Sequence, residues 1–211
     1  MTKLIILHGL GQTEEDWEDV TNSLDIESLT IPLFSSTDDD AIITIQSIYS
    51  SISKQLNVID EPFYLFGLSL GGLLTLMYTI ENKNLLLKGI IVSGAIYKPI
   101  PKTIILLQSI VFKLLPRHHF TDIGLTKSQM IQLITSVSVD LTNQLKNVVL
   151  PTLVICGEKD KANLTASRQI HNLIVESKLV IIPNGKHELN KSSSDKLSQT
   201  INSYIQKKES N

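Results

Sequence analysis

Short apolar runs alternate with stretches of helical periodicity along the first 93 residues. Apolar runs at residues 3–7, 29–34, 63–66 and 88–93 predict strands, and a run without polar alternation is typical of a strand covered on both faces. Residues 13–24, 41–57 and 70–80 predict helices. The side chains expected to face inward from the first two helices are Trp17, Val20, Leu24, Ile42, Ile45, Tyr49, Ile52 and Leu56.

The alternation stops between residues 94 and 149, where the pattern predicts helical pieces only. These are residues 101–115, a piece opened by a capping box at Thr126 and Gln129, and residues 139–148. The alternation resumes with predicted strands at 151–156 and 179–182 and predicted helices at 164–176 and 191–206. Repeated strand and helix units predict an α/β fold with a mostly parallel sheet flanked by helices. We expect a core of residues 1–93 and 150–211 and a helical cap insertion at 94–149.

The composition is typical of a globular domain with a sizeable core. The 211 residues are 42% hydrophobic and 19% charged, with a net charge of −2. Because no basic stripe is present, nucleic acid is not an expected partner. The apolar segment 103–115 is broken by Gln108 and Lys113 and is too short to span a bilayer, so no integral membrane segment is predicted. The oligomeric state stays open.

The single cysteine, Cys156, lies in an apolar run, which predicts a buried thiol without a disulfide partner. The first residues show no signal peptide pattern. Both observations favour a cytoplasmic location. The acidic run at residues 38–40 is expected to cap the next helix rather than to bind metal. Neither a metal nor a cofactor is predicted.

A serine between glycines follows the predicted strand at residues 63–66. The segment Gly67-Leu68-Ser69-Leu70-Gly71 places Ser69 where a strand becomes a helix, which is the Gly-x-Ser-x-Gly pattern of a nucleophile elbow. Such a turn strains the serine backbone, and a side chain at either flanking glycine would collide with a neighbouring strand or helix. A plain glycine-rich helix start is the alternative, unless the chain also supplies a base, an acid and an oxyanion donor.

Two loops after later strands supply the candidate base and acid. Asp160 follows the strand at 151–156 and His187 follows the strand at 179–182, at the sheet edge where open parallel sheets build their sites. The expected catalytic roles are Ser69 as nucleophile, His187 as general base and acid, and Asp160 as the carboxylate that orients the imidazole. The competing residues, which we interpret as solvated loop carboxylates and as surface or cap histidines, are Glu158, Glu188, His118, His119 and His171.

A glycine-rich loop directly after the first strand supplies the remaining part. The motif His8-Gly9 opens this loop, which can bring a backbone N–H close to Ser69. The expected oxyanion hole consists of the main-chain N–H groups of Leu10 and Leu70. His8 is expected to order the loop by hydrogen bonding rather than to transfer protons.

These motifs together resemble the α/β-hydrolase-fold family, in particular its small single-domain carboxylesterases. The resemblance covers nearly the whole chain and rests on His8-Gly9 with Trp17 downstream, Gly67 to Gly72 around Ser69, Gly157-Glu158-Lys159-Asp160 and Gly185-Lys186-His187. The chain order serine, aspartate, histidine is that of the family. Two departures exist. The antiparallel hairpin common before the first strand is missing, which implies about six strands, and the base loop reads Asn184-Gly185-Lys186-His187 instead of glycine-x-glycine-histidine.

The insertion bears on the substrate. Its first helical piece is apolar on more than one face, which predicts burial against the domain or around an apolar ligand: Ile100, Ile104, Ile105, Leu107, Ile110, Val111, Leu114 and Leu115. The resemblance implies a serine hydrolase that cleaves an ester of a small-to-medium apolar acyl group through an acyl-enzyme.

The sequence does not separate esters from thioesters or amides as substrates. It also leaves two alternatives to an esterase. One alternative is a menaquinone-pathway-type lyase that uses the same triad for proton abstraction. Its polyanionic substrate should need several cationic anchors, whereas the chain has two arginines, Arg117 and Arg168. The other is a non-catalytic ligand-binding protein of the same fold.

Overall fold

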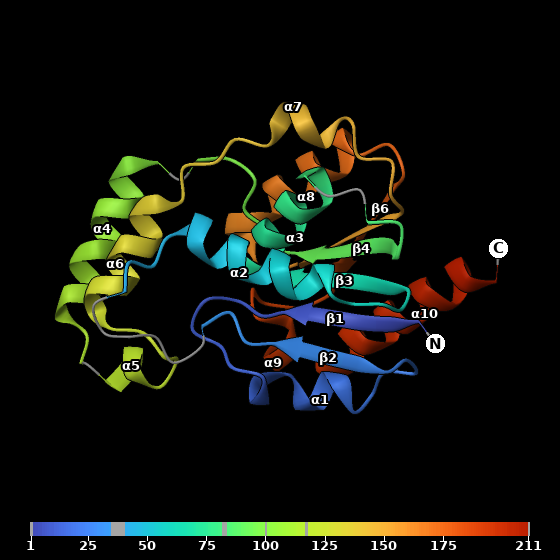
Figure 1. Cartoon of the computed structure of the whole chain (residues 1–211), viewed down its shortest axis with the longest axis horizontal. Coiled ribbons are helices and arrows are strands. Elements are labelled where there is room, and N and C mark those ends of the chain that lie inside the picture. The colour runs from blue at the N-terminus through green and yellow to red at the C-terminus, as the bar shows by residue number, and fades with distance from the viewer. Residues whose placement is uncertain (1, 35–40, 82–83, 100, 117, 211) are drawn as a thin grey trace.

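A parallel sheet forms the centre of the protein (Figure 1). The computed structural model describes residues 2–34, 41–81, 84–99, 101–116 and 118–210. In this part of the chain the sheet has six strands in the order β2-β1-β3-β4-β5-β6, and every neighbouring pair is parallel. The strands are β1 (Lys3–Leu7), β2 (Ser28–Ile31), β3 (Phe63–Leu68), β4 (Leu87–Ser93), β5 (Thr152–Gly157) and β6 (Ser177–Ile182). The predicted fold class is confirmed.

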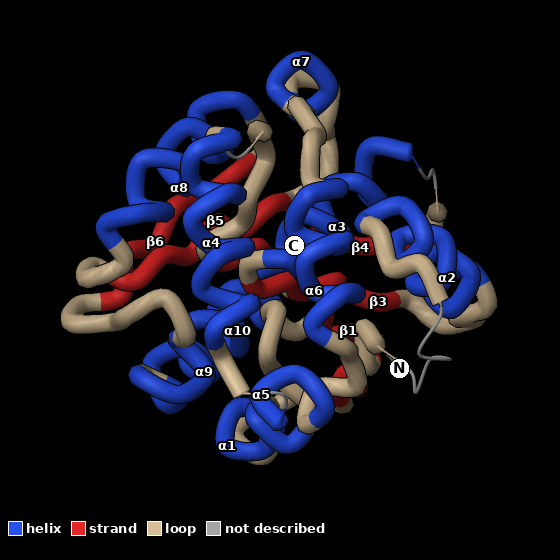
Figure 2. The backbone as a smooth tube through the Cα atoms, turned by 90° about the vertical axis from the view of Figure 1, so that its left-hand side faces the viewer, coloured by secondary structure: helices blue, strands red, loops and turns tan. Residues whose placement is uncertain are grey.

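Helices cover both faces of the sheet (Figure 2). The helices that pack on one face are α2 (Ile45–Asn57), α3 (Leu70–Glu81) and α8 (Lys161–Leu173). The elements on the other face are η1 (Glu15–Trp17), α1 (Glu18–Thr21), α9 (Leu189–Ser192) and α10 (Ser194–Glu209). Side chains of β1 alternate between the two cores, with Ile5 and Leu7 in the first and Leu4 and Ile6 in the second. This alternation explains why the strand is apolar throughout.

The chain between β4 and β5 is helical, as the sequence predicts. It contains α4 (Lys102–Leu114), α5 (His118–Thr121), α6 (Lys127–Ser136) and α7 (Thr142–Leu145). The capping box of α6 is present, with Thr126 and Gln129 each accepting a hydrogen bond from the other's backbone N–H. Helices α4 to α6 lie beyond the carboxyl ends of the strands, whereas α7 packs near α3 and α8 (Figure 1). The division into core and cap stays a prediction.

Helix α2 begins four residues later than the sequence predicts. Thr44 has extended backbone angles and caps the helix by accepting a hydrogen bond from the backbone N–H of Ser47. Ile42 therefore lies outside the helix and is 71% exposed, so its assignment to the core was wrong. The acidic run at residues 38–40, which was expected to cap this helix, lies outside the described residues.

Helix α4 also departs from the prediction, because none of its residues is buried. The apolar side chains that were expected to be buried against the domain or around an apolar ligand, but are exposed in the structure, are Ile104, Leu107, Ile110, Val111 and Leu114. Ile105 and Leu115 are partly buried, and Ile100 lies outside the described residues. Neither α4 nor any other helix in the described part of the chain is both long and apolar enough to cross a bilayer.

Candidate functional site

Ser69 lies in a strained turn between β3 and α3. Its φ angle is 54°, in the left-handed region that side chains disfavour. A Cβ atom at Gly67 would lie 2.3 Å from the carbonyl oxygen of Gly71, and one at Gly71 would lie 2.0 Å from the carbonyl oxygen of Leu7. Both glycines are therefore required by close backbone contacts, as the elbow pattern predicts.

Asp160 and His187 lie in contact at the carboxyl ends of β5 and β6. His187 Nδ1 is 2.7 Å from Asp160 Oδ2. The two loops are tied together, because Lys159 N donates to Gly185 O at 2.8 Å. Asn184 adopts a φ of 62°, a left-handed conformation that asparagine tolerates better than most residues. The unusual Asn184-Gly185 segment therefore forms a turn that carries His187 to Asp160.

Hydrogen bonding sets the charge states of this pair. The hydrogen bond with Asp160 raises the pKa of His187, and burial offsets part of the rise. Burial raises the pKa of Asp160, but the hydrogen bonds from His187 and Asn163 outweigh it and hold the pKa below its ordinary value. With Nδ1–H donating to the Asp160 carboxylate, the Nε2 atom of neutral His187 is an acceptor that can take a proton.

Ser69 and His187 line the same cavity, which measures about 540 Å³. Its wall combines apolar side chains with a few amides and hydroxyls. The other described residues that line it are Ala95, Ile96, Tyr97, Lys98, Pro99, Pro101, Ile104, Gln108, Ala162, Asn163, Thr165, Ala166 and Gln169. Among these described residues Lys98 is the single cation, and Tyr97 donates a hydrogen bond from its hydroxyl to Gln169. The cavity is thus suited to an uncharged or weakly charged ligand.

Solved structures of other proteins match the fold of this protein over nearly the whole chain. They include MenH from S. aureus, at 19% identity over 99% of this chain and 94% of that chain, with a TM-score of 0.80. An esterase from Exiguobacterium antarcticum matches at 17% identity over 98% and 92%, with a TM-score of 0.83. MGS-M2, an alpha/beta hydrolase enzyme from a deep-sea metagenome library, matches at 16% identity over 97% and 89%, with a TM-score of 0.82.

The chain has the α/β-hydrolase fold. No family model matches the sequence. A Haemophilus influenzae protein provisionally named 2-succinyl-6-hydroxy-2,4-cyclohexadiene-1-carboxylate synthase is 31% identical over 104 residues, which cover 45% of this chain. The match spans 41% of that relative's length. The α/β-hydrolase fold itself is therefore established, and its neighbours include esterases.

The loop after β1, which contains the candidate oxyanion donor Leu10, is held by buried hydrogen bonds. His8 Nδ1 lies 2.9 Å from Gly9 O, and Leu33 N donates to His8 Nε2 at 3.1 Å. Burial lowers the pKa of His8. A neutral ring with a donor at Nδ1 and an acceptor at Nε2 satisfies both contacts. These contacts support the predicted role of His8 in ordering the loop.

Gln12 connects the loop after β1 to the loop of the candidate base, and the sequence pattern did not reveal this residue. Its Oε1 accepts hydrogen bonds from Gly9 N at 3.0 Å and from Trp17 Nε1 at 3.2 Å. Its Nε2 donates to Glu188 Oε1 at 3.0 Å and to Asn190 Oδ1 at 3.1 Å. Gln12 is 2% exposed, so these contacts satisfy all the polar atoms of a buried amide.

Asn163 is a second residue that sequence reasoning missed. Its Nδ2 atom lies 2.9 and 3.0 Å from the two carboxylate oxygens of Asp160. Asp160 is also the N-cap of α8 and accepts from the backbone N–H of Asn163. A capping aspartate three residues before a polar amide is a signal that could have indicated this contact.

Three of the competing side chains have other partners, and the side chain of His119 is not among those that the structure describes. Glu158 accepts a hydrogen bond from Asn184 N at 2.9 Å, and Glu188 pairs with Gln12 and Lys191. His171 Nδ1 lies 2.8 Å from Ser177 Oγ. His118 is exposed in α5. Of the described residues, no group of three His, Cys, Asp or Glu side chains is placed to hold a metal ion.

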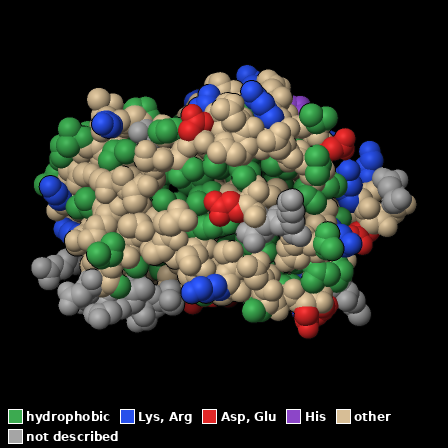
Figure 3. Space-filling view, turned by 45° about the horizontal axis from the view of Figure 1, so that its top comes forward, with side chains coloured by type: hydrophobic (Ala, Val, Ile, Leu, Met, Phe, Trp, Pro, Cys, Tyr) green, Lys and Arg blue, Asp and Glu red, His purple; other side chains and the backbone are tan. Residues whose placement is uncertain are grey.

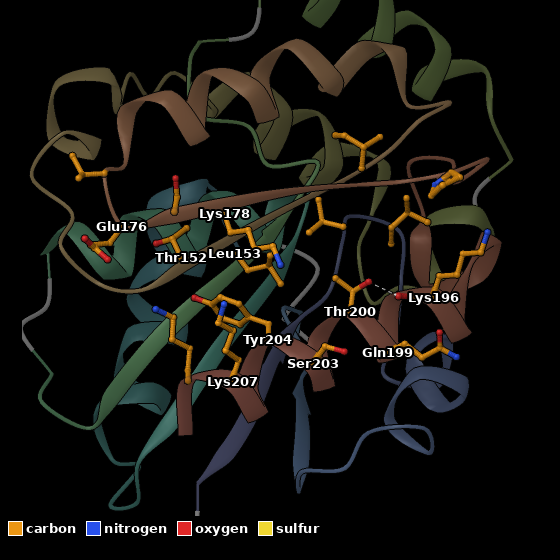
Figure 4. Close-up of a pocket in the computed structure, with 17 residues that line it drawn as sticks. Thr152, Leu153, Glu176, Lys178, Lys196, Gln199, Thr200, Ser203, Tyr204 and Lys207 are labelled. Carbon is orange, nitrogen blue, oxygen red and sulfur yellow. Dashed lines mark hydrogen bonds between the residues drawn. The ribbon is translucent and has the colours of Figure 1, made fainter. Parts of the chain in front are cut away.

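A second and larger cavity in this protein lies between β6 and α10 (Figure 4). It measures about 580 Å³, and its described lining includes Lys178, Lys196, Lys207 and Tyr204. None of the predicted site residues lines it. Since it contains neither Ser69 nor His187, we assign the candidate chemistry to the smaller cavity.

Proposed function

We propose that the protein is a serine hydrolase that cleaves carboxylic esters of small-to-medium apolar acyl groups through an acyl-enzyme intermediate. The main support for this proposal is that Ser69 and His187 line the same cavity and that His187 is hydrogen-bonded to Asp160. The strained turn at Ser69 supports a role as nucleophile, because strain of this kind is maintained where function requires it.

The proposed reaction has two stages. Ser69 Oγ attacks the ester carbonyl while His187 Nε2 takes the hydroxyl proton, and His187 then gives this proton to the leaving alkoxide. Water next attacks the acyl-enzyme with His187 again acting as base, which releases the acid and restores the Ser69 hydroxyl. Asp160 keeps the imidazole in the required tautomer and stabilises its charged form.

The proposed oxyanion donors are the backbone N–H groups of Leu10 and Leu70. Leu70 is the first residue of α3, where helix geometry leaves the N–H without an intrahelical acceptor. Gly9 N is already bonded to Gln12 Oε1, so the loop's free donor is expected one residue later, at Leu10. The positive end of α3 adds to the stabilisation of the oxyanion.

The helical segment at residues 94–149 is proposed to act as a cap that forms one wall of the substrate cavity. Ile96, Pro101 and Ile104 come from this segment and line the cavity together with Ala162 and Ala166 of α8. This mostly apolar wall supports an alkyl or acyl group as ligand. A cytoplasmic location stays a prediction from the sequence.

The second candidate is elimination chemistry, which the similarity to the provisionally named Haemophilus influenzae synthase favours. The cavity argues against a polyanionic substrate, because Lys98 is the single cation among its described lining residues. Arg168 is exposed on α8 outside this lining, and Arg117 lies outside the described residues. We therefore favour ester hydrolysis.

Two measurements test the proposal. A fluorophosphonate probe should label the wild-type protein and should not label Ser69→Ala, with Ser93→Ala as a control that keeps the label. Turnover of p-nitrophenyl esters of graded chain length should then be highest for short or medium acyl groups. Labelling that persists in Ser69→Ala would refute the nucleophile, and labelling without turnover of any ester would refute the ester substrate.

A further inference from the structure

Helix α4 presents an unusual amount of apolar surface to solvent. Six of its large hydrophobic side chains are between 45% and 80% exposed: Ile104, Leu106, Leu107, Ile110, Val111 and Leu114. Hydrophobic side chains gather with Lys or Arg side chains at the left end of Figure 3, where α4 lies. An exposed apolar patch of this kind commonly marks an interaction surface.

The exposed side chains form one continuous stripe. Leu106, Ile110 and Leu114 follow one another at four-residue spacing, and Leu107 and Val111 form the adjacent row. The opposite side of α4 packs on α6, and Phe112 of α4 contacts Phe120 of α5 edge to face. The stripe therefore points away from the rest of the protein.

Lysines border this stripe. Lys102 and Lys113 are about three turns apart and so project from nearly the same side of the helix. Lys127 of α6 donates to the backbone carbonyl of Lys113 at 3.1 Å. None of these three lysines forms an ion pair with another described residue. Their charges are therefore available to an anionic partner.

The chain has a small net charge, but its basic and acidic side chains are unevenly distributed along the sequence. Residues 94–149 contain six basic and two acidic side chains, a net charge of +4. The remaining residues contain 13 basic and 19 acidic side chains, a net charge of −6. This distribution orients the protein in an electric field, with the segment that contains α4 toward negative charge.

We propose that the α4 stripe docks on an anionic lipid surface. An amphipathic helix with leucines on one face and lysines at its border lies in the headgroup region, where the apolar side chains enter the acyl boundary and the lysines meet anionic headgroups. A second copy docked through the same stripe would bring two segments of charge +4 together. Charge complementarity therefore favours the lipid surface over self-association.

Docking would bring the candidate active site to the lipid surface. Ile104 belongs both to the exposed stripe and to the lining of the cavity that contains Ser69. An apolar substrate dissolved in the lipid would thus reach the cavity from the docked face. The docking itself does not depend on the triad, since no triad residue belongs to the stripe.

Co-sedimentation with vesicles tests the proposal without any turnover. The full chain should bind vesicles of equal parts phosphatidylcholine and phosphatidylglycerol, and not vesicles of phosphatidylcholine alone. Leu107→Glu should abolish this binding, and Lys102→Gln and Lys113→Gln should each weaken it roughly fivefold. Added salt should weaken binding of the wild type because it screens the headgroup charge.

Matched controls separate docking from general effects. Leu85→Glu alters a leucine that is 90% exposed before β4 and should leave binding unchanged. Circular dichroism should confirm that Leu107→Glu folds. Absence of binding to the anionic vesicles would overturn the proposal, as would equal binding to both vesicle types. A dimer in sedimentation velocity that Leu107→Glu dissociates would replace the lipid with a second copy.

Discussion

At the residue scale, Asp160 carries its charge in a buried position. Burial opposes ionisation, and the hydrogen bonds from His187 and Asn163 compensate for it. The same carboxylate caps α8, so one side chain both starts a helix and orients the candidate base. Asn163 lies against both members of the pair, since its Nδ2 atom is also 3.1 Å from His187 Nδ1.

Changing Asp160 to asparagine tests this arrangement. Asp160→Asn should keep the fold and lower kcat/KM for esters by roughly 10⁴-fold, because the imidazole loses its orienting carboxylate. Glu158→Gln, which alters a neighbouring carboxylate, is the control and should stay close to wild type. Steady-state kinetics on p-nitrophenyl esters measure both. Full activity of Asp160→Asn would move the acid role to another carboxylate.

The pH dependence follows from the raised pKa of His187. Only the neutral imidazole accepts the serine proton, so activity should fall as pH drops through this pKa. We expect the acid limb of kcat/KM to lie above the ordinary imidazole value of about 6.5. In Asp160→Asn the residual activity should show this limb at lower pH, because the hydrogen bond that raises the pKa is gone. An unmoved limb would mean that another group titrates.

At the scale of elements, the candidate site depends on how two loops are tied together. The loop after β1 and the loop after β6 lie far apart in sequence and meet through Gln12, Glu188 and Asn190. Asn190 also donates to Asp16 O at 2.9 Å, and Lys191 pairs with the Asp16 carboxylate at 3.0 Å. One polar network thus joins the loop that contains the proposed oxyanion donor Leu10 to the loop of the candidate base His187.

Replacing Gln12 should weaken both stability and catalysis. In Gln12→Leu, Gly9 N and Trp17 Nε1 lose their acceptor inside the protein, which should cost about 1–3 kcal/mol of unfolding free energy. The kcat should fall more than KM rises, because the loop after β1 and His187 lose their common support. Urea unfolding and steady-state kinetics measure these effects. The control Gln55→Leu, on the exposed surface of α2, should change neither.

At the scale of the whole molecule, one hydrophobic cluster joins the sheet and the helical segment. Phe120, Leu133 and Ile134 of α5 and α6 belong to the same buried cluster as Leu7 and Ile31 of the sheet. Unfolding the segment would expose part of the core that α2 and α3 cover. We therefore expect residues 94–149 and the sheet to unfold together.

Calorimetry tests this coupling. The protein should show one transition with equal calorimetric and van 't Hoff enthalpies. Leu133→Ala should lower the stability of the whole protein by about 2–5 kcal/mol, because this side chain is 1% exposed and its removal leaves a cavity. Leu106→Ala, at a position 63% exposed, is the matched control and should have little effect. Two separated transitions would contradict a continuous core.

Much of the fold could be predicted from the sequence, because buried strands and helices have characteristic spacings of apolar residues. The apolar runs at β1, β3, β4 and β5 correspond to strands covered on both faces. The order of strands and helices then requires a parallel sheet, and its carboxyl edge collects the loops of Ser69, Asp160 and His187. These three residues could therefore be identified as candidates from the sequence, and their catalytic roles stay predictions.

Only the tertiary structure decided which apolar and polar side chains find partners. The exposure of Ile42 and of the α4 stripe could not be predicted, because periodicity indicates a helix face but not whether anything covers it. Gln12 was missed for the same reason, since its partners Glu188 and Asn190 are distant in sequence. Local pattern determines which segments form strands and helices, whereas contacts between distant residues form only when the whole chain folds.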